Sequence, residues 1–138
     1  MFENLRSSFL AATLVAMPAI AVAVEEAPMT VTGATTVTVD ESLELFDQGV
    51  AFVDVRKPSD FEAGRVAGAI NLDLNDGFSQ ESLLEVAGLQ DPVVIYCNGA
   101  ACLRSSKAIA QAVSWGYETV YYMRDGYPVW DIAGFPVE

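Results

Sequence analysis

Two cysteines and a nearby arginine are the residues of this chain whose types and spacing could carry out chemistry. Cys97 and Cys102 are its only cysteines, and Arg104 follows them closely. The reactive form of cysteine is the thiolate, and the chain has no histidine that could act as its base. Amide groups at a helix start and a neighbouring cation can instead lower a cysteine pKa from about 8.5 to roughly 3.5–7.5. The sequence therefore predicts Cys97 as a nucleophile that is activated without imidazole.

The residues around the two cysteines are mostly small, which favours a loop whose backbone N–H groups turn toward a bound anion. A single cysteine at a strand end is often only a small buried apolar residue. Here a strand, a loop of small residues, an Arg-Ser pair and a helix occur together, and that combination favours a binding loop. The predicted substrate-binding residues are Asn98, Gly99, Ala100, Ala101, Leu103, Arg104 and Ser105.

Apolar runs and amphipathic stretches alternate along the chain and predict the elements that must position this loop. Residues 92–96 form the clearest strand, and residues 104–115 form a helix with an apolar face. Strands alternating with helices predict an α/β domain with a mostly parallel sheet, whose ligands bind at the carboxyl ends of strands. The other expected strands are 37–39, 50–53, 69–71 and 119–122, and the other expected helical segments follow Asp40, span 59–63, follow Ser79 and span 127–133.

Composition excludes several function classes. The net charge is −12 with only seven lysines and arginines, which argues against binding to nucleic acid, because phosphate backbones require a basic surface. Two cysteines without histidine make a poor zinc site, since zinc usually takes four nitrogen or sulfur ligands. Composition therefore disfavours a metal site.

The N-terminal residues have the pattern of a secretory signal peptide. An apolar run from Phe9 to Val24 ends in an Ala-Val-Ala cleavage pattern and is followed by two glutamates. The run contains Pro18 and is shorter than the about 20 residues that a membrane span needs. A buried helix and an uncleaved anchor are the alternatives. We expect a signal peptide at 1–23, a linker at 24–35 and one domain at 36–138, with no stable membrane insertion after cleavage.

From about residue 36 to residue 137 the chain resembles the rhodanese family in the order and spacing of several motifs. The segments that carry the resemblance are 52–56, 60–61, 64–71, 96–99, 104–105, 126–130 and 134–137. The resemblance implies a single rhodanese-like domain with a five-stranded parallel sheet flanked by helices. Read with it, the predicted signal peptide indicates an exported, periplasmic protein.

The resemblance also implies an activity and a set of site residues. Cys97 would take a sulfane sulfur from a small anionic donor such as thiosulfate, hold it as a persulfide and pass it to a thiol or cyanide acceptor. Asp54, Arg56 and Arg65 would be structural residues, the first two forming an ion pair that braces the loop. Such an activity would need no metal and no organic cofactor. No particular protein partner is indicated.

The loop is longer than the family's usual single-domain loop, and Cys102 occupies part of the addition. It resembles the loop of a subset of rhodanese-like proteins with two cysteines in a C-x4-C spacing. Cys102 is a resolving thiol that attacks the Cys97 persulfide, a buried filler, or itself the sulfur carrier. In an oxidising compartment a Cys97–Cys102 disulfide is a plausible resting state, provided that the Cα atoms lie within about 7 Å.

Three other functions remain as alternatives to sulfur transfer. The two cysteines could serve a thiol–disulfide oxidoreductase or a redox sensor, although the C-x-x-C spacing of thioredoxin-like proteins is absent from the sequence. The scaffold could also be a non-catalytic binding module. A phosphatase or arsenate reductase is disfavoured, because such loops place the arginine closer to the cysteine.

Overall fold

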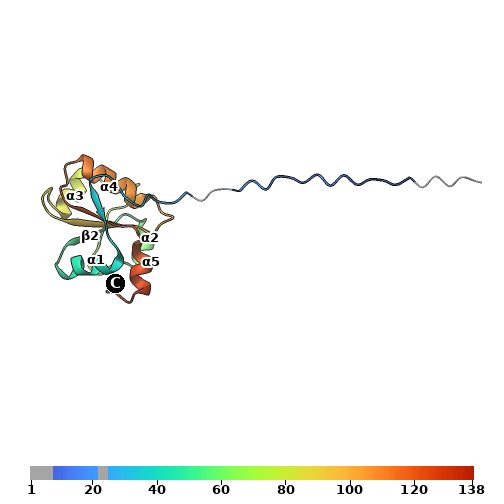
Figure 1. The fold of residues 1–138 in the computed structure, drawn as a ribbon. Helices are drawn as coiled ribbons and strands as arrows, with labels where there is room; N and C mark the ends of the chain where they lie inside the picture. The colour runs from blue at the N-terminus through green and yellow to red at the C-terminus, as the bar shows by residue number, and fades with distance from the viewer. Residues whose placement is uncertain (1–7, 22–24) are drawn as a thin grey trace, which may run out of the picture.

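The computed structural model describes residues 8–21 and 25–138. Residues 1–7 and the predicted cleavage site after Ala23 lie outside the described residues. Residues 8–21 form no helix or strand, and their apolar side chains are exposed, as for Phe9 at 95% (Figure 1). Within the described ranges no helix combines the length and the apolar character needed to cross a bilayer.

Five parallel strands form one sheet in the order β1-β5-β4-β2-β3, which confirms the predicted α/β class. Because every described pairing is parallel, the carboxyl ends of all five strands lie at one edge. The strands are β1 (Ala34–Thr36), β2 (Ala51–Asp54), β3 (Ile70–Asn71), β4 (Val93–Tyr96) and β5 (Val120–Met123).

The central strand β4 is buried on both faces, which explains its unbroken apolar sequence. Val93 and Ile95 belong to the core cluster on one face of the sheet, whereas Val94 and Tyr96 belong to the cluster on the other. This alternation continues to Cys97, which belongs to the same cluster as Ile95. The strand therefore directs the Cys97 side chain toward one particular helical layer.

Helices cover both faces of the sheet, giving three layers (Figure 1). The cluster with Cys97 is covered by α3 (Gln80–Val86) and α4 (Arg104–Ser114), and the opposite cluster by α1 (Val39–Asp47), α2 (Pro58–Ala63) and α5 (Gly126–Ile132). Ser79 caps α3, as predicted. The cap of α1 is Thr38 instead of Asp40, because the Thr38 side chain and Glu41 form a reciprocal capping box.

The first strand lies earlier than predicted, at 34–36 instead of 37–39. The sheet therefore includes residues 34 and 35, which belong to the predicted linker. Two features produce the shift. Thr38 is used as a helix cap, and the β-branched Thr35 and Thr36 pair with Tyr121 and Tyr122 of β5.

Residues 27 and 28, also in the predicted linker, lie against the domain. Ala27 is only 3% exposed, and its N–H donates to the carbonyl of Ala100 at 2.6 Å. The guanidinium of Arg124 donates to the carbonyls of Ala27 and Pro28 at 2.8 and 3.1 Å, and the Tyr122 hydroxyl also donates to Pro28. This part of the segment is thus packed on the structure near the cysteine loop.

Candidate active-site loop

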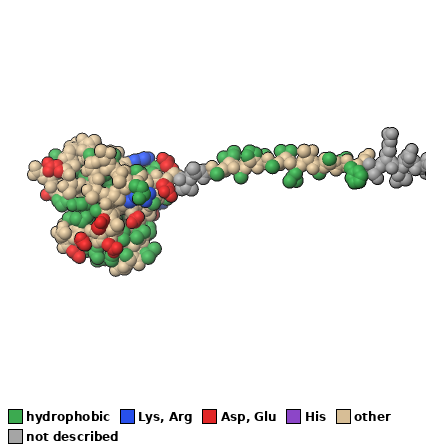
Figure 2. All heavy atoms as spheres, viewed as in Figure 1, with side chains coloured by type: hydrophobic (Ala, Val, Ile, Leu, Met, Phe, Trp, Pro, Cys, Tyr) green, Lys and Arg blue, Asp and Glu red, His purple; other side chains and the backbone are tan. Residues whose placement is uncertain are grey.

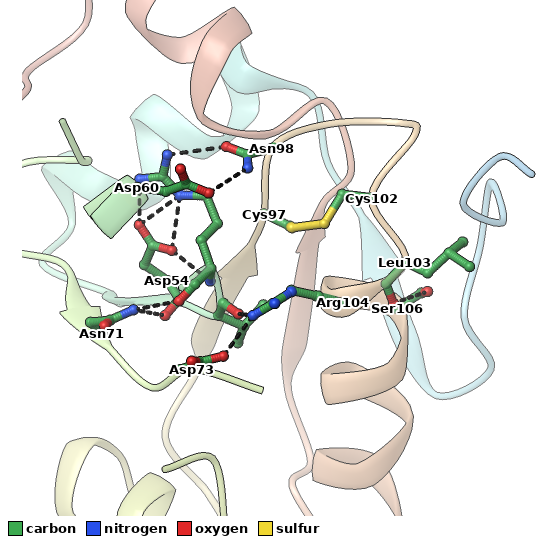
Figure 3. The surroundings of a disulfide bond; sticks show 12 residues. Asp54, Asp60, Asn71, Asp73, Cys97, Asn98, Cys102, Leu103, Arg104 and Ser106 are labelled. Atoms are coloured by element: carbon green, nitrogen blue, oxygen red, sulfur yellow. Dashed lines mark hydrogen bonds and ion pairs between the residues drawn. A yellow bond between two sulfur atoms is a disulfide. The ribbon is translucent and has the colours of Figure 1, made fainter. Parts of the chain in front are cut away.

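The two cysteines lie at the edge of the sheet where all five strands end. Cys97 directly follows the central strand β4, and Arg104 begins α4 six residues after Asn98. Asp54 ends the neighbouring strand β2. Because parallel strands bring their carboxyl ends together, side chains that are distant in sequence surround this loop (Figure 3).

A disulfide joins Cys97 to Cys102, with their Cα atoms 6.4 Å apart (Figure 3). The separation meets the geometric condition stated from the sequence. Cys97 is 1% exposed and Cys102 is half-buried. In this oxidised form neither sulfur is a thiolate, so nucleophilic attack by either cysteine requires prior reduction.

The loop backbone is held at its ends and open in its middle. The N–H of Cys102 donates to the Gly99 carbonyl, and the N–H of Tyr127 donates to the Cys97 carbonyl, both at 2.9 Å. Gly99 has φ +123°, in the region that favours glycine. Within residues 8–21 and 25–138, the N–H groups of Ala100 and Ala101 donate to no protein acceptor. They are therefore available to a bound anion or to water.

Asp54 and Arg56 form a buried ion pair at the end of β2. The Arg56 Nη2 atom lies 2.7 Å from Asp54 Oδ2, and the two side chains are 4% and 0% exposed. The Arg56 Nε atom donates to both carboxylate oxygens. Burial lowers the pKa of Arg56, but the hydrogen bond and charge of Asp54 outweigh it and raise this pKa above its ordinary value. Arg56 thus keeps its positive charge, and its hydrogen bonds to Asp54 hold it in place.

Arg56 connects this ion pair to the cysteine loop. Its Nη1 atom donates to the side-chain oxygen of Asn98 at 3.1 Å, and the Asn98 amide donates to Asp60 at 3.1 Å. Its Nη2 atom also donates to the Gly64 carbonyl, and its guanidinium lies over the Tyr127 ring at 4.6 Å. Asn98 is therefore oriented away from the disulfide, toward α2 (Figure 3).

Arg104 differs from the sequence-based expectation. It was expected to offer its charge to the Cys97 sulfur, but its Nη1 atom lies 2.6 Å from Asp73 Oδ1. The same atom contacts the Val55 carbonyl at 3.5 Å. Figure 3 shows the Arg104 side chain passing the disulfide on its way to Asp73. The positive charge of Arg104 is thus paired with a carboxylate.

The remaining predicted residues have varied positions. Leu103 is the N-cap residue of α4, and Ser105 is buried in its first turn. Arg65 contacts Glu138 at 3.4 Å, and its guanidinium lies over Phe61. Arg65 is thus held by a residue of α2 and by the last residue of the sequence. In the described parts of the chain, no contact joins Arg65 to the cysteine loop.

Three residues near the loop had not been identified from the sequence. Asp73 pairs with Arg104, Arg124 anchors residues 27–28, and the Asn71 amide donates to the carbonyls of Asp54 and Arg56. All three end or closely follow a strand. That position was the available signal, because in a parallel sheet such residues share one edge.

A surface hollow of about 290 Å³ lies at the opposite edge of the sheet. Its one titratable lining residue, Asp91, accepts a hydrogen bond from the N–H of Gly88 at 2.9 Å. The hollow therefore offers little chemistry, and the cysteine loop is the better candidate site.

Comparison with protein families and curated proteins identifies relatives of this chain. The family model for the Rhodanese-like domain matches residues 38–133. The thiosulfate sulfurtransferase GlpE of Pseudomonas fluorescens is 33% identical over 99 residues, which cover 72% of this chain and 85% of that protein. The HTH-type transcriptional regulator Rv0324 of Mycobacterium tuberculosis is 37% identical over 89 residues. The match spans 64% of this chain but only 38% of that regulator.

Solved structures show the same fold. The solution structure of the rhodanese-like domain of the Alr3790 protein from Anabaena has a TM-score of 0.64 at 21% identity, covering 75% of this chain and 77% of that one. The Rhodopseudomonas palustris protein RPA3614, described as a possible tyrosine phosphatase, has a TM-score of 0.63 at 26% identity, covering 78% and 86%. The architecture is thus shared with relatives of low sequence identity.

Proposed function

This chain belongs to the rhodanese-like domain family, and we propose that it is a sulfurtransferase that carries a sulfane sulfur as a persulfide on Cys97. Its similarity to curated thiosulfate sulfurtransferases supports the general activity. The observation that carries the proposal is the position of Cys97. It lies at the carboxyl end of the central strand, at the start of a loop that leads into α4.

The first step is reduction of the disulfide by a thiol or dithiol, which yields two free cysteines and the oxidised reductant. The Cys97 thiolate then attacks the outer sulfur of thiosulfate. A bond forms between the two sulfurs, the S–S bond of thiosulfate breaks, and sulfite leaves with its electron pair. The N–H groups of Ala100 and Ala101 have no protein acceptor in the described ranges, and in this proposal they stabilise the negative charge on the bound sulfur.

The second step transfers the outer sulfur to an acceptor. Cyanide attacks that sulfur, thiocyanate forms, and Cys97 leaves as the thiolate, so the cycle closes without net oxidation. Cys102 offers another outcome, because its Cα lies 6.4 Å from that of Cys97. Its thiolate can attack the Cys97 sulfur of the persulfide. Hydrosulfide then leaves, and the two cysteines are joined as the disulfide.

The experiment compares the reduced wild type with Cys97→Ser and Cys102→Ser. Each protein is treated with thiosulfate, and peptide mass spectrometry identifies the cysteine that has gained one sulfur atom. Thiocyanate formation with cyanide is measured in parallel. We expect Cys97→Ser to lose both signals and Cys102→Ser to keep both. Loss of both signals only with Cys102→Ser would show that Cys102 is the carrier.

A thiol–disulfide oxidoreductase or redox sensor is the second candidate, and the Cys97–Cys102 disulfide favours it. This function requires both cysteines, since one thiol attacks the substrate disulfide and the other resolves the mixed disulfide. Disulfide reduction that depends on both residues, without thiocyanate formation, would support it. Inactivity in both assays together with a retained affinity for anions would instead indicate a binding module.

We further propose that residues 1–23 are a signal peptide and that the mature protein is periplasmic. The apolar run and the Ala-Val-Ala pattern before Val24 support this proposal. Expression in a bacterium followed by intact mass measurement of the periplasmic protein tests it. A mass starting at Val24 is expected, and a full-length cytoplasmic product would contradict export.

A further inference from the structure

The arginines that border the cysteine loop are all engaged by other groups. Arg56 pairs with Asp54 in the buried ion pair, and Arg104 pairs with Asp73 at 2.6 Å. Arg124 gives its hydrogen bonds to the carbonyls of residues 27 and 28, with Glu26 3.9 Å away. Thus each guanidinium beside the loop has either a carboxylate or carbonyl oxygens as partners.

The chain as a whole is acidic, although basic side chains lie near the loop. The whole chain has a net charge of −12. Figure 2 shows acidic side chains spread over the visible face, while basic ones gather where the N-terminal segment leaves the domain. Thiosulfate carries two negative charges, and the net negative charge of the protein opposes its approach unless an unpaired cation faces it.

Asp73 is the residue that decides whether Arg104 can provide that cation. Its side chain is 12% exposed and that of Arg104 is 29% exposed, so solvent screens the pair only partly. In the view of Figure 3 the Arg104 side chain extends from the start of α4, below the disulfide, to Asp73. Without the carboxylate, this guanidinium would present an uncompensated charge at the end of the loop where α4 begins, two residues after Cys102.

We propose that Asp73 is a specificity-determining residue, which disfavours dianionic donors and directs the site toward neutral or zwitterionic persulfides of the type R–S–SH. The inference rests on the proposed sulfur transfer. In that reaction the Cys97 thiolate bonds to the outer sulfur of the donor. The donor's S–S bond breaks, the thiolate R–S⁻ leaves, and the proton stays on the transferred sulfur, so that charge and atoms balance.

The experiment measures the local charge separately from sulfur transfer. In the Cys102→Ser background Cys97 is the single thiol of the chain. Its alkylation rates with the anion iodoacetate and with neutral iodoacetamide are expressed as a ratio, which cancels changes in thiol ionisation and exposure. Asp73→Asn keeps the oxygen that accepts the Asn75 N–H at 3.0 Å, so the local turn is retained.

We expect Asp73→Asn to raise the iodoacetate-to-iodoacetamide ratio about fivefold, since it unmasks one charge near the sulfur. The matched control Asp76→Asn removes the same charge from an exposed residue of the same turn and should change the ratio less than twofold. Adding Arg104→Gln to Asp73→Asn should return the ratio to the background value. The kcat/KM for thiosulfate should rank these variants in the same order as the alkylation ratio does.

A ratio for Asp73→Asn that stays within twofold of the background, or that Asp76→Asn matches, would overturn the inference. If Asp73→Asn does not fold, Arg104→Gln alone is decisive, because the unpaired Asp73 should then lower the ratio about fivefold. An unchanged ratio in that variant also rejects the inference. Absence of thiocyanate in every protein would count against sulfur transfer itself, while the alkylation ratio still tests the role of Asp73.

Discussion

The backbone N–H of Ala27 donates a 2.6 Å hydrogen bond to the carbonyl of Ala100, between the two cysteines. Ala27 precedes the part of the chain that matches the family model, which begins at residue 38. Arg124 fixes this contact, because its guanidinium donates to the Ala27 and Pro28 carbonyls. The N-terminal segment and β5 therefore both contribute to the position of the cysteine loop.

Arg124→Ala should release this segment from the loop. It removes hydrogen bonds from a charged donor, each worth roughly 1.5–3 kcal/mol. We expect faster amide hydrogen exchange at Ala27 and across residues 99–102, measured by mass spectrometry on the oxidised protein. Arg65→Ala is the matched control, because its guanidinium pairs with Glu138 and is not in contact with the loop. Equal exchange in the wild type and Arg124→Ala would refute the role of Arg124.

Gly126→Ala should destabilise the domain by bringing a methyl group into the loop. A Cβ at this position would lie 2.5 Å from both the Cys97 carbonyl oxygen and the Gly99 nitrogen. Gly126 also has φ +74°, which costs a residue with a side chain roughly 1–2 kcal/mol. Overpacking against the loop should add about 1–3 kcal/mol to this loss in the free energy of unfolding. Urea unfolding of the oxidised protein measures the total.

Gly134→Ala is the control for backbone strain alone. Gly134 has φ +78°, and nothing lies within 4 Å of a Cβ built there. Gly134→Ala should lower the free energy of unfolding only by the roughly 1–2 kcal/mol that its backbone conformation costs. If the two alanine variants were equally stable, the close approach of Gly126 to the loop would be energetically unimportant.

The sequence predicted the framework of this site better than its contacts. Strand β4 and helix α4 have strong local patterns, an unbroken apolar run and an apolar face at helical spacing. The position of Cys97 between them could therefore be predicted. The boundaries of β1 could not, because Thr36 and Thr38 suit both a strand and a helix cap.

The electrostatic partners were not predictable from local pattern. Asp73 and Arg104 are distant in the chain and meet only because β3 and β4 end at the same edge of the sheet. The expectation that Arg104 faces the sulfur used the residues next to it and left out this carboxylate. Asp54 and Arg56 were easier to pair, since they lie two positions apart in one motif.

Arg56→Met should be one of the more damaging single substitutions near the loop. It leaves the Asp54 carboxylate, 0% exposed, without its cation, and breaking a buried pair in this way costs about 3–5 kcal/mol. Arg65→Met provides the comparison, because the Arg65–Glu138 pair is partly exposed, at 28% and 51%, and should contribute about 1 kcal/mol or less. Urea unfolding measures both, and similar losses would show that the Asp54–Arg56 pair contributes little.

The last prediction concerns alkaline pH and Tyr96. This side chain is 0% exposed, and its hydroxyl accepts a hydrogen bond from the N–H of Val66. Burial, followed by the nearby Asp54 carboxylate, raises the pKa of Tyr96 well above its ordinary value of about 10. Above about pH 10 the unfolded chain loses this proton while the folded protein retains it. The contribution of Tyr96 is therefore complete below about pH 10 and decreases as the pH rises.

Tyr96→Phe should make the free energy of unfolding less sensitive to pH in this range. The wild type should lose up to about 1.4 kcal/mol per pH unit more than the variant above about pH 10. Burial also raises the pKa of Tyr117 and Tyr122, so some pH dependence should remain in the variant. Urea unfolding between about pH 9 and 11 measures the slopes, with Tyr121→Phe on β5 as a half-buried control. If Tyr96→Phe and the wild type had the same slope, Tyr96 would not be a source of alkaline destabilisation.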